Sequence, residues 1–236
     1  MSAIRGLIFD KDGTLFDFRA TWGGWSQRLV ERLGAAHGVA PATLGAVIGY
    51  DPASGTFAPE SPVVAHTVAE IATILLPHLP GMTLPRLVAE MNALASQAVL
   101  VEATALLPLF QHFRGLGLRL GLATNDGEAP ARSHLEKAGI VDLFDFIAGF
   151  DSGHGAKPDP APLLAFAEAV GLPPAAIAMV GDSRHDLTAG RRAGMKTVAV
   201  LTGVAEAEEL ADLADVVLRD IGHLPGWIEA QATAAG

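Results

Sequence analysis

Short apolar runs alternate with segments of helical periodicity throughout the part of the chain that follows residue 115. The apolar runs have the length of buried strands, and the helical patterns between them end close to a glycine, as C-terminal helix capping predicts. Strands joined through helices make right-handed crossovers, so they lie parallel in a sheet that is covered on both faces. The sequence therefore predicts an α/β protein. Its predicted strands are residues 7–9, 118–123, 144–148, 177–180, 197–201 and 216–218, and helices are predicted at 132–139, 161–170 and 186–193.

Residues 17–104 interrupt this alternation. Helical spacing of apolar residues recurs at 22–33, 62–76 and 84–100, and no strand pattern lies between these stretches. The interruption falls directly after the first predicted strand. We therefore expect an all-helical second domain inserted after strand one, with residues 1–16 and 105–236 forming the α/β core. Hinges are expected near residues 16–18 and 103–107.

The charge balance excludes two classes of partner. The 236 residues include 16 Lys and Arg against 26 Asp and Glu, a formal net charge of −10. This excess repels nucleic-acid phosphates and anionic membrane surfaces, so we expect neither nucleic acid nor a membrane as a partner. The longest uncharged stretch, residues 33–50, is interrupted by glycines and a proline, which argues against a membrane-spanning helix.

The absence of cysteine excludes a disulfide framework, a thiolate metal site and a cysteine nucleophile. Any chemistry must then use oxygen, nitrogen or water. The first residues lack the apolar region of a signal peptide, which leads us to expect a cytoplasmic protein. The sequence leaves the oligomeric state open.

Polar residues collect where four of the predicted strands end. In open α/β sheets, ligands bind outside the carboxyl ends of the strands, so these residues are the candidates for a functional site. The first strand is followed by residues 10–14, DKDGT, and the second by residues 124–126, TND. Lys157 follows the third strand within GAKPDP, and residues 181–186, GDSRHD, follow the fourth.

With these motifs, in this order and at this spacing, the chain resembles the haloacid dehalogenase superfamily and, within it, the phosphoglycolate-phosphatase-like group. The motifs are DKDGTL at 10–15, LATN at 122–125, Lys157-Pro158, and GDS at 181–183 continuing through Asp186 to AGM at 193–195. The resemblance covers nearly the whole chain. It implies a Rossmann-like parallel sheet, a helical cap domain that closes over the site, and metal-dependent phosphoryl transfer through a phosphoaspartate.

Asp10 is the nucleophile that the resemblance implies. A carboxylate that attacks phosphorus splits a slow hydrolysis into two easier steps. The approach of two anions is opposed by about 4 kcal/mol for each pair of unit charges at roughly 4 Å and an effective dielectric constant of about 20, so cations must be present. Mg²⁺ suits such a site because it binds carboxylates, water and phosphate. Its expected ligands are Asp10, Asp182 and the main-chain carbonyl of Asp12.

The remaining motif residues surround this centre in the family pattern. Lys157 is expected to be catalytic and to bind the phosphate together with Thr124 and Asn125. For Asn125, a turn or helix-cap role is the alternative. Asp186 would support the metal or Lys157, and Thr14 is expected to support the metal ligands.

Asp12 lies two residues beyond the nucleophile, close enough to reach the leaving oxygen while Asp10 attacks the phosphorus. We expect Asp12 to protonate the leaving group and then to act as base for the water. In the superfamily, dehalogenases need no such proton and lack this second aspartate, as do phosphonate-cleaving relatives. Both activities are therefore less favoured than phosphate-ester hydrolysis.

Substrate choice would lie in the inserted segment, near the first hinge. Arg19, Trp22 and Arg28 are the candidates, with a place in the core as the alternative for the tryptophan. The carboxylates and the phosphate carry more negative charge than Mg²⁺ and Lys157 balance. A second anionic group on the substrate would therefore need an arginine of its own.

The residues and the resemblance together predict a Mg²⁺-dependent phosphatase that hydrolyses a small phosphorylated metabolite, with 2-phosphoglycolate as the default substrate. Two alternatives stay open. A phosphomutase would keep the same acid and transfer the phosphoryl group to a sugar hydroxyl. A catalytically silent binding protein would have kept the fold without the reaction.

Overall fold

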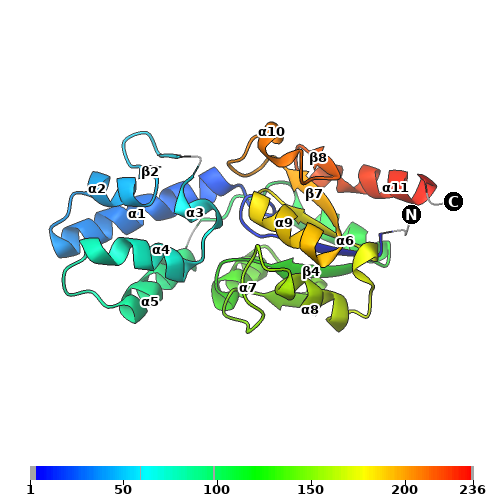
Figure 1. Ribbon diagram of the computed structural model, residues 1–236, viewed down its shortest axis with the longest axis horizontal. Helices are drawn as coiled ribbons and strands as arrows, with labels where there is room; N and C mark the ends of the chain where they lie inside the picture. The colour runs from blue at the N-terminus through cyan, green and yellow to red at the C-terminus, as the bar shows by residue number, and fades with distance from the viewer. Residues whose placement is uncertain (1–3, 59, 98, 235–236) are drawn as a thin grey trace.

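The computed structural model describes residues 4–58, 60–97 and 99–234. An α/β part and a helical part lie side by side along the long axis of the molecule (Figure 1).

The strands are β1 (Gly6–Phe9), β2 (Tyr50–Asp51), β3 (Thr56–Phe57), β4 (Arg119–Ala123), β5 (Phe146–Ala148), β6 (Ile177–Gly181), β7 (Lys196–Val200) and β8 (Val216–Leu218). The α-helices are α1 (Phe18–His37), α2 (Pro41–Val47), α3 (Pro62–Ala65), α4 (Val68–Leu75), α5 (Leu84–Ala95), α6 (Leu106–Gly115), α7 (Glu128–Lys137), α8 (Ala161–Ala169), α9 (Arg184–Ala193), α10 (Ala207–Leu210) and α11 (Leu224–Ala234). Short 3₁₀ turns are η1 (Leu76–His78), η2 (Val141–Leu143), η3 (Pro174–Ala176) and η4 (Ile221–His223).

One parallel sheet runs through the α/β part in the order β5, β4, β1, β6, β7, β8, which confirms the predicted fold class. β1 lies between β4 and β6, and its side chains alternate between the two faces of the sheet. Leu7 and Phe9 enter the hydrophobic cluster that contains Phe110 of α6, whereas Ile8 enters the cluster that contains Phe166 of α8. The central strand is thus covered on both faces, as its uninterrupted apolar sequence requires.

Helices α7 and α9 begin earlier in the chain than predicted, because hydrogen bonds to the N–H groups of their first turns extend them. α9 begins at Arg184 because Ser183 and Asp186 form a capping box, in which each side chain accepts a hydrogen bond from the main-chain N–H of the other residue. α7 begins at Glu128, ahead of the predicted residue 132. The main-chain N–H of Glu128 donates to the Asp151 carboxylate at 2.8 Å, a contact that joins residues far apart in the sequence.

The inserted segment, residues 17–104, packs helices α1 to α5 around a hydrophobic cluster that includes Trp25, Leu29 and Met91. α1 begins after Asp17, whose side chain accepts a hydrogen bond from the main-chain N–H of Ala20 at 2.9 Å. The predicted helix at 62–76 is divided into α3 and α4, because Thr67 starts a new capping box with Glu70. Figure 1 shows these helices on the left, in blue to green.

The expectation that the inserted segment is all-helical is wrong in one place. β2 and β3 form a two-stranded antiparallel sheet in which Tyr50 pairs with Phe57, and the two rings lie 5.0 Å apart. Gly55, in the turn between them, has a left-handed φ of 71°, and the Asp51 carboxylate accepts a hydrogen bond from the Ala53 N–H at 3.0 Å. Strands of two residues are too short to produce a visible alternation in the sequence.

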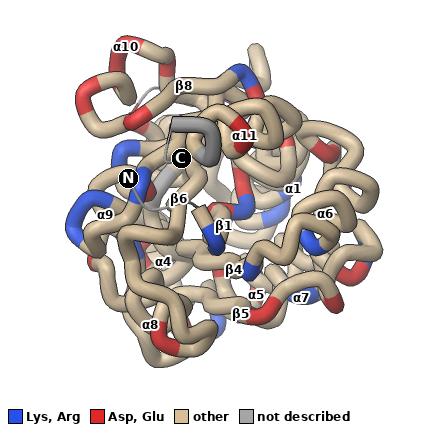
Figure 2. The backbone as a smooth tube through the Cα atoms, turned by 90° about the vertical axis from the view of Figure 1, so that its right-hand side faces the viewer, with Lys and Arg blue, Asp and Glu red and all other residues tan. Residues whose placement is uncertain are grey.

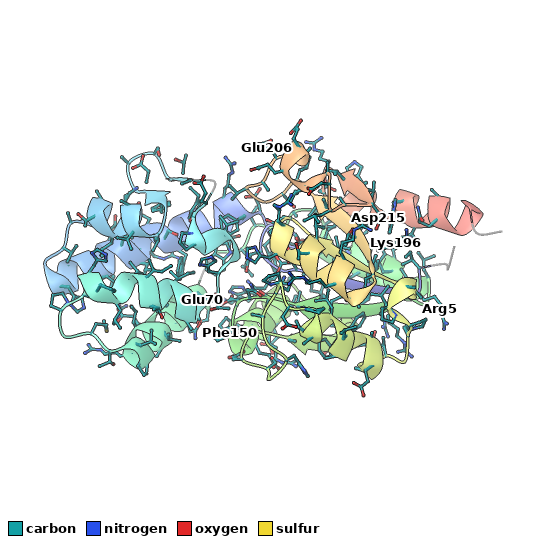
Figure 3. The ribbon with its side chains drawn as sticks, viewed as in Figure 1. Arg5, Glu70, Phe150, Lys196, Glu206 and Asp215 are labelled. Carbon is teal, nitrogen blue, oxygen red and sulfur yellow. The ribbon has the colours of Figure 1, made fainter. Side chains whose placement is uncertain are left out.

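The two chain segments that join the inserted segment to the sheet are bonded to each other. Phe16 and Glu102 form an antiparallel bridge, and the Ala103 N–H donates to the Leu15 carbonyl at 2.9 Å. Phe150, from the loop after β5, packs against the hydrophobic cluster of the inserted segment, and Figure 3 shows it at the junction of the two parts. The exact domain boundaries and the hinge function of these segments stay predictions.

Charged residues of both signs are interspersed along the α/β part (Figure 2). Many of them pair at the surface; the Arg184 guanidinium, for example, lies 2.6 Å from the Asp212 carboxylate. Among the described residues, no helix has both the length and the apolar character that crossing a membrane requires.

Candidate active site

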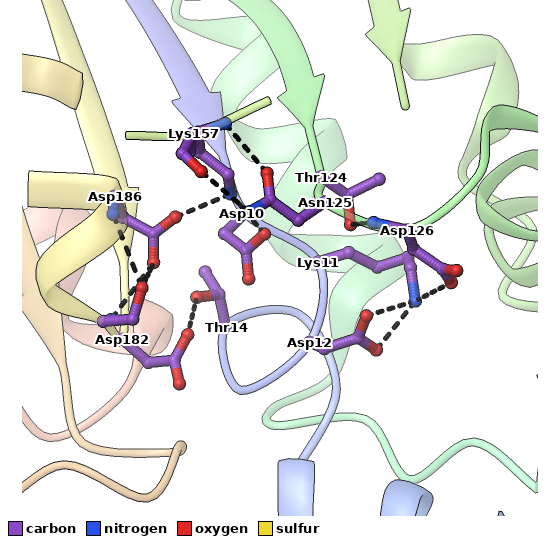
Figure 4. A network of polar contacts seen from close by, with 11 residues as sticks. Asp10, Lys11, Asp12, Thr14, Thr124, Asn125, Asp126, Lys157, Asp182 and Asp186 are labelled. Atoms are coloured by element: carbon purple, nitrogen blue, oxygen red, sulfur yellow. Dashed lines mark hydrogen bonds and ion pairs between the residues drawn. The ribbon is translucent and has the colours of Figure 1, made fainter. Parts of the chain in front are cut away.

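The carboxyl ends of β1, β4 and β6 bring side chains from distant parts of the chain to one point (Figure 4). Asp10 follows β1, Lys157 comes from the loop before α8, and Asp182 and Asp186 lie at the junction of β6 and α9. One oxygen of each of the three aspartates lies within 4.8 Å of the others. Nζ of Lys157 lies 2.5 Å from Oδ1 of Asp10 and 2.6 Å from Oδ1 of Asp186. The lysine therefore bridges the end of β1 and the start of α9.

Asn125 holds the main chain of Lys157. Its Nδ2 donates to the Lys157 carbonyl at 2.9 Å, and its Oδ1 accepts a hydrogen bond from the Lys157 N–H at 2.9 Å. Thr124, the residue before it, accepts a hydrogen bond on Oγ1 from the Asp126 N–H at 3.1 Å. The loop after β4 thus fixes the main chain of Lys157. Asn125 is the residue that positions this lysine. The assignment of Thr124 and Asn125 to phosphate binding stays a prediction.

Asp182 is enclosed by the first motif. Thr14 donates a hydrogen bond from Oγ1 to Oδ1 of Asp182 at 3.4 Å. Gly13 and Gly203 flank the same carboxylate so closely that a Cβ at either position would collide with it. Gly13 also has a left-handed φ of 79°, which a side chain would strain. The glycine of the DKDGT motif therefore lets the loop close over Asp182.

The cluster carries excess negative charge in a buried place. Burial raises the pKa of Asp10 to about 7; Lys157 opposes this rise, while Asp186 and Asp12 add to it. Burial, together with Asp186 and Asp10, raises the pKa of Asp182 well above its usual value. For Lys157 burial lowers the pKa, but Asp10 and Asp186 raise it more, so this lysine stays charged.

The donor set fits a hard divalent cation. Carboxylate oxygens are the protein ligands that Mg²⁺ takes, and a bound cation would offset the unbalanced charge of the cluster. Asp186 already uses Oδ1 for Lys157 and Oδ2 for Ser183. Asp10 and Asp182 are therefore the better carboxylates for an ion, and Asp186 is suited to holding the lysine.

Replacing Asp10 with Asn is expected to stabilise the metal-free protein above neutral pH. A carboxyl group with a folded-state pKa of about 7, against an ordinary value of 3.8, stabilises the fold fully below about pH 4. That contribution is lost as the pH rises through 7, because the buried group must then ionise. The amide has no charge to bury, so with EDTA at about pH 8 the melting temperature of the variant should exceed that of the parent by on the order of 10 °C. The difference should shrink toward pH 4; a lower melting temperature for the variant at pH 8 would contradict this account.

A buried lysine that the sequence analysis does not single out lies beside the cluster. Lys11 is 0% exposed. Its Nζ lies 2.6 Å from Oδ2 of Asp12, 3.3 Å from Oδ2 of Asp126 and 3.2 Å from Nδ1 of His134. Burial lowers the pKa of Lys11, but Asp12 and Asp126 raise it more, so Lys11 is charged. Figure 4 shows this second network on the side of Asp10 away from Asp182.

His134 connects this network to the inserted segment. Burial, followed by the charge of Lys11, lowers the pKa of His134 to about 4, so its ring is neutral at pH 7. A ring that accepts from Lys11 at Nδ1 and donates from Nε2 to the Ala95 carbonyl, 2.9 Å away, satisfies both contacts. Lysines usually lie in solvent. The one sequence signal for Lys11 is its place between the two aspartates of the first motif.

A cavity opens between the strand ends and the inserted segment. From the α/β part it is lined by Asp10, Asp12, Thr124, Asn125 and Asp126. Trp22 lines it from α1, and its role in substrate choice stays a prediction. Arg19 and Arg28 are exposed, and neither lines this cavity. The structure thus brings together the predicted residues of the strand ends but leaves the two arginines outside.

The model of the haloacid dehalogenase-like hydrolase family matches residues 7–200. A phosphoglycolate phosphatase from Rhodospirillum rubrum is 38% identical over 113 residues, which are 48% of this chain and 46% of that protein. The chain spans about half the length of this relative and of four further curated relatives that it matches. A phosphoglycolate phosphatase from Shigella boydii serotype 4 is 30% identical over an alignment 257 positions long, gaps included. The alignment covers 94% of this chain and 91% of that protein.

The fold is also similar to that of a solved β-phosphoglucomutase from Clostridium difficile. The TM-score is 0.70 at 20% sequence identity, and the likeness covers 98% of both chains. At this identity the comparison shows a shared fold.

Proposed function

The chain belongs to the haloacid dehalogenase-like hydrolase family, as its motifs predict, and from this premise we propose that it is a metal-dependent phosphatase of small phosphate monoesters. The observation that carries the proposal is the buried Asp10 carboxylate at the end of β1. It is paired with Lys157, lies within the acidic cluster and lines a cavity that it shares with Asp12. A nucleophile and a proton donor thus line one space, and a buried cation pairs with the nucleophile.

Asp10 and Asp182, with the main-chain carbonyl of Asp12, would hold Mg²⁺. When bound, the ion would offset the charge repulsion between the Asp10 carboxylate and the phosphate. The chain itself supplies a fixed positive charge at the same place through Lys157, which Asp186 and Asn125 hold in position. Asp182 is held in turn by Thr14.

In the proposed reaction, an oxygen of Asp10 forms a bond to phosphorus while the bond from phosphorus to the ester oxygen breaks. Asp12 gives its proton to the departing oxygen and so releases an alcohol. Asp12, now a carboxylate, takes a proton from the water that attacks the phosphoaspartate, which regenerates Asp10 and releases phosphate. Thr124 lines the same cavity and is proposed to donate to the phosphate.

Lys11 is proposed to position Asp12 for the second of these transfers, in which Asp12 is a carboxylate. Its ammonium lies 2.7 and 2.6 Å from the two oxygens of Asp12, so it fixes the direction in which that carboxylate points. Asp126 and His134 fix Lys11 from its other sides. Burying a charged lysine costs free energy of folding, which its carboxylate partners must offset. The proposed positioning role accounts for why Lys11 is buried here.

Phosphate release from a panel of small phosphate esters, with and without Mg²⁺, tests the proposal. We expect turnover with Mg²⁺, its loss in EDTA and inhibition by excess Ca²⁺, which accepts more ligands in looser geometry. The panel should include p-nitrophenyl phosphate and 2-phosphoglycolate, the latter because relatives are named for it. Undiminished turnover in rigorously metal-free buffer would rule out the metal. Absence of turnover on every ester would favour a silent binding protein.

A phosphomutase is the second candidate, and the likeness to a β-phosphoglucomutase fold favours keeping it. The same Asp10 and Asp12 would then serve transfer to a sugar hydroxyl in place of water. An isomerised sugar phosphate as product, together with activation by a sugar bisphosphate, would establish this reading over hydrolysis.

A further inference from the structure

The wall that the inserted segment contributes to the cavity is almost entirely apolar. It consists of Phe18, Trp22 and Trp25 of α1, together with side chains of α3 and α4 that include Val63, Val64 and Ile71. The Trp22 and Trp25 rings pack edge to face with centroids 5.1 Å apart, so α1 presents a rigid aromatic surface. The space between this wall and the strand ends is about 530 Å³ when its opening to solvent is counted.

No arginine or lysine of the inserted segment faces this space within the described residues. The arginines of the segment, Arg19, Arg28, Arg32 and Arg86, are all exposed. Arg32 is also paired with Glu90 at 2.6 Å. Among the described residues that line the wall, His66 is the one histidine. It is exposed, and its ring lies edge-on to the ring of His185.

The buried lysines near the cavity are already matched by carboxylates. Lys157 has Asp10 and Asp186, and Lys11 has Asp12 and Asp126. A carboxylate on the substrate would thus meet an apolar wall, without a cation of the inserted segment to pair with and opposite the acids of the α/β part. Taking an unpaired carboxylate out of water costs several kcal/mol.

We propose that the substrate is a phosphate monoester of a neutral, mainly apolar alcohol, with an aromatic or branched hydrocarbon group that packs on Trp22, Trp25 and the valines of α3. The proposal rests on the phosphatase function proposed above and names the substrate class of that site. Arg19 and Arg28, which the sequence suggests for binding an anionic group of the substrate, do not line the cavity and are given no contact with this alcohol.

Benzyl phosphate and 2-phosphoglycolate form the decisive pair, because both are esters of primary alcohols and differ in the group that would meet the apolar wall. With Mg²⁺ at about pH 8, we expect kcat/KM to be at least about tenfold higher for benzyl phosphate. Equal values, or a preference for 2-phosphoglycolate, would overturn the proposal while leaving the phosphatase function intact.

Val64→Arg places a cation on the half-buried cavity wall. It should narrow or reverse the preference by raising kcat/KM for 2-phosphoglycolate and lowering it for benzyl phosphate. Arg86→Ala, an exposed change on α5, is the control and should leave the ratio unchanged. Arg28→Ala separates the two accounts: a loss confined to 2-phosphoglycolate would show that the arginine recognises substrate and would overturn the apolar assignment. Melting temperatures confirm that each variant is folded.

A binding measurement keeps the substrate proposal testable without turnover. In the Asp10→Asn variant, quenching of the tryptophan fluorescence, to which Trp22 and Trp25 contribute together with Trp227, should give a dissociation constant at least about tenfold lower for benzyl phosphate than for 2-phosphoglycolate. If no ester is hydrolysed but benzyl phosphate binds preferentially, the phosphatase function fails and the ligand class stands. Tighter binding of 2-phosphoglycolate would overturn the ligand class.

Discussion

Replacing Asp10 with Asn is expected to lower kcat/KM by about 10⁴-fold or more, the scale of loss when a covalent nucleophile is removed. The amide keeps the size and polarity of the carboxylate but cannot form the bond to phosphorus. Asp10 is the carboxylate that both contacts Lys157, at 2.5 Å, and lines the cavity.

The measurement is steady-state phosphate release at saturating Mg²⁺, with circular dichroism to confirm the fold. Asp142→Asn is a matched control, because it makes the same chemical change at an exposed position of η2 away from the cluster. The control should retain parental activity. If Asp10→Asn kept a tenth or more of that activity, Asp10 would lose its assignment as nucleophile.

Asp12→Ala should separate the two half-reactions. Nitrophenolate leaves without a proton donor, so Asp10 should still attack p-nitrophenyl phosphate, and its release should show a burst of up to about one equivalent per active site. The water that hydrolyses the phosphoaspartate then lacks its base, so the following steady state should be at least about 10²-fold slower than that of the parent. An alkyl phosphate needs the proton in the first step and should show neither burst nor turnover. Acid quench should trap the phosphoenzyme.

Asp126→Asn is the matched control for this experiment. Asp126 also pairs with Lys11 and lines the cavity, but the proposal gives it no proton to move. It should show no burst and no accumulated phosphoenzyme, although its melting temperature falls as Lys11 loses a partner. If Asp12→Ala instead lost alkyl and aryl phosphate activity in the same proportion, without a trapped intermediate, Asp12 would be a structural residue.

The parallel sheet and the grouping of polar residues were predictable because their signals are local. Each strand of the α/β part needs only a short apolar run, and strands joined by helices lie parallel. Once they do, Asp10, Thr124 and Asp182 meet at one edge because each follows the carboxyl end of a strand. The order of the motifs also sufficed to identify the family, which the comparisons confirm.

The tertiary structure alone decided which charges are buried and paired. In the sequence Lys11 looks like an ordinary loop lysine. In the structure its ammonium contacts Asp126 and His134, which lie more than a hundred residues away along the chain. Arg19 and Arg28 occupy the same helix as Trp22, but only the tryptophan lines the cavity. The sequence by itself determined the strands of the parallel sheet and which motif residues gather at the strand ends, because both follow from neighbours along the chain. The partners of Lys11 and the apolar wall opposite Asp10 depend on how α1, α3 and α4 pack over the sheet, and that packing is set by contacts between residues far apart in the sequence.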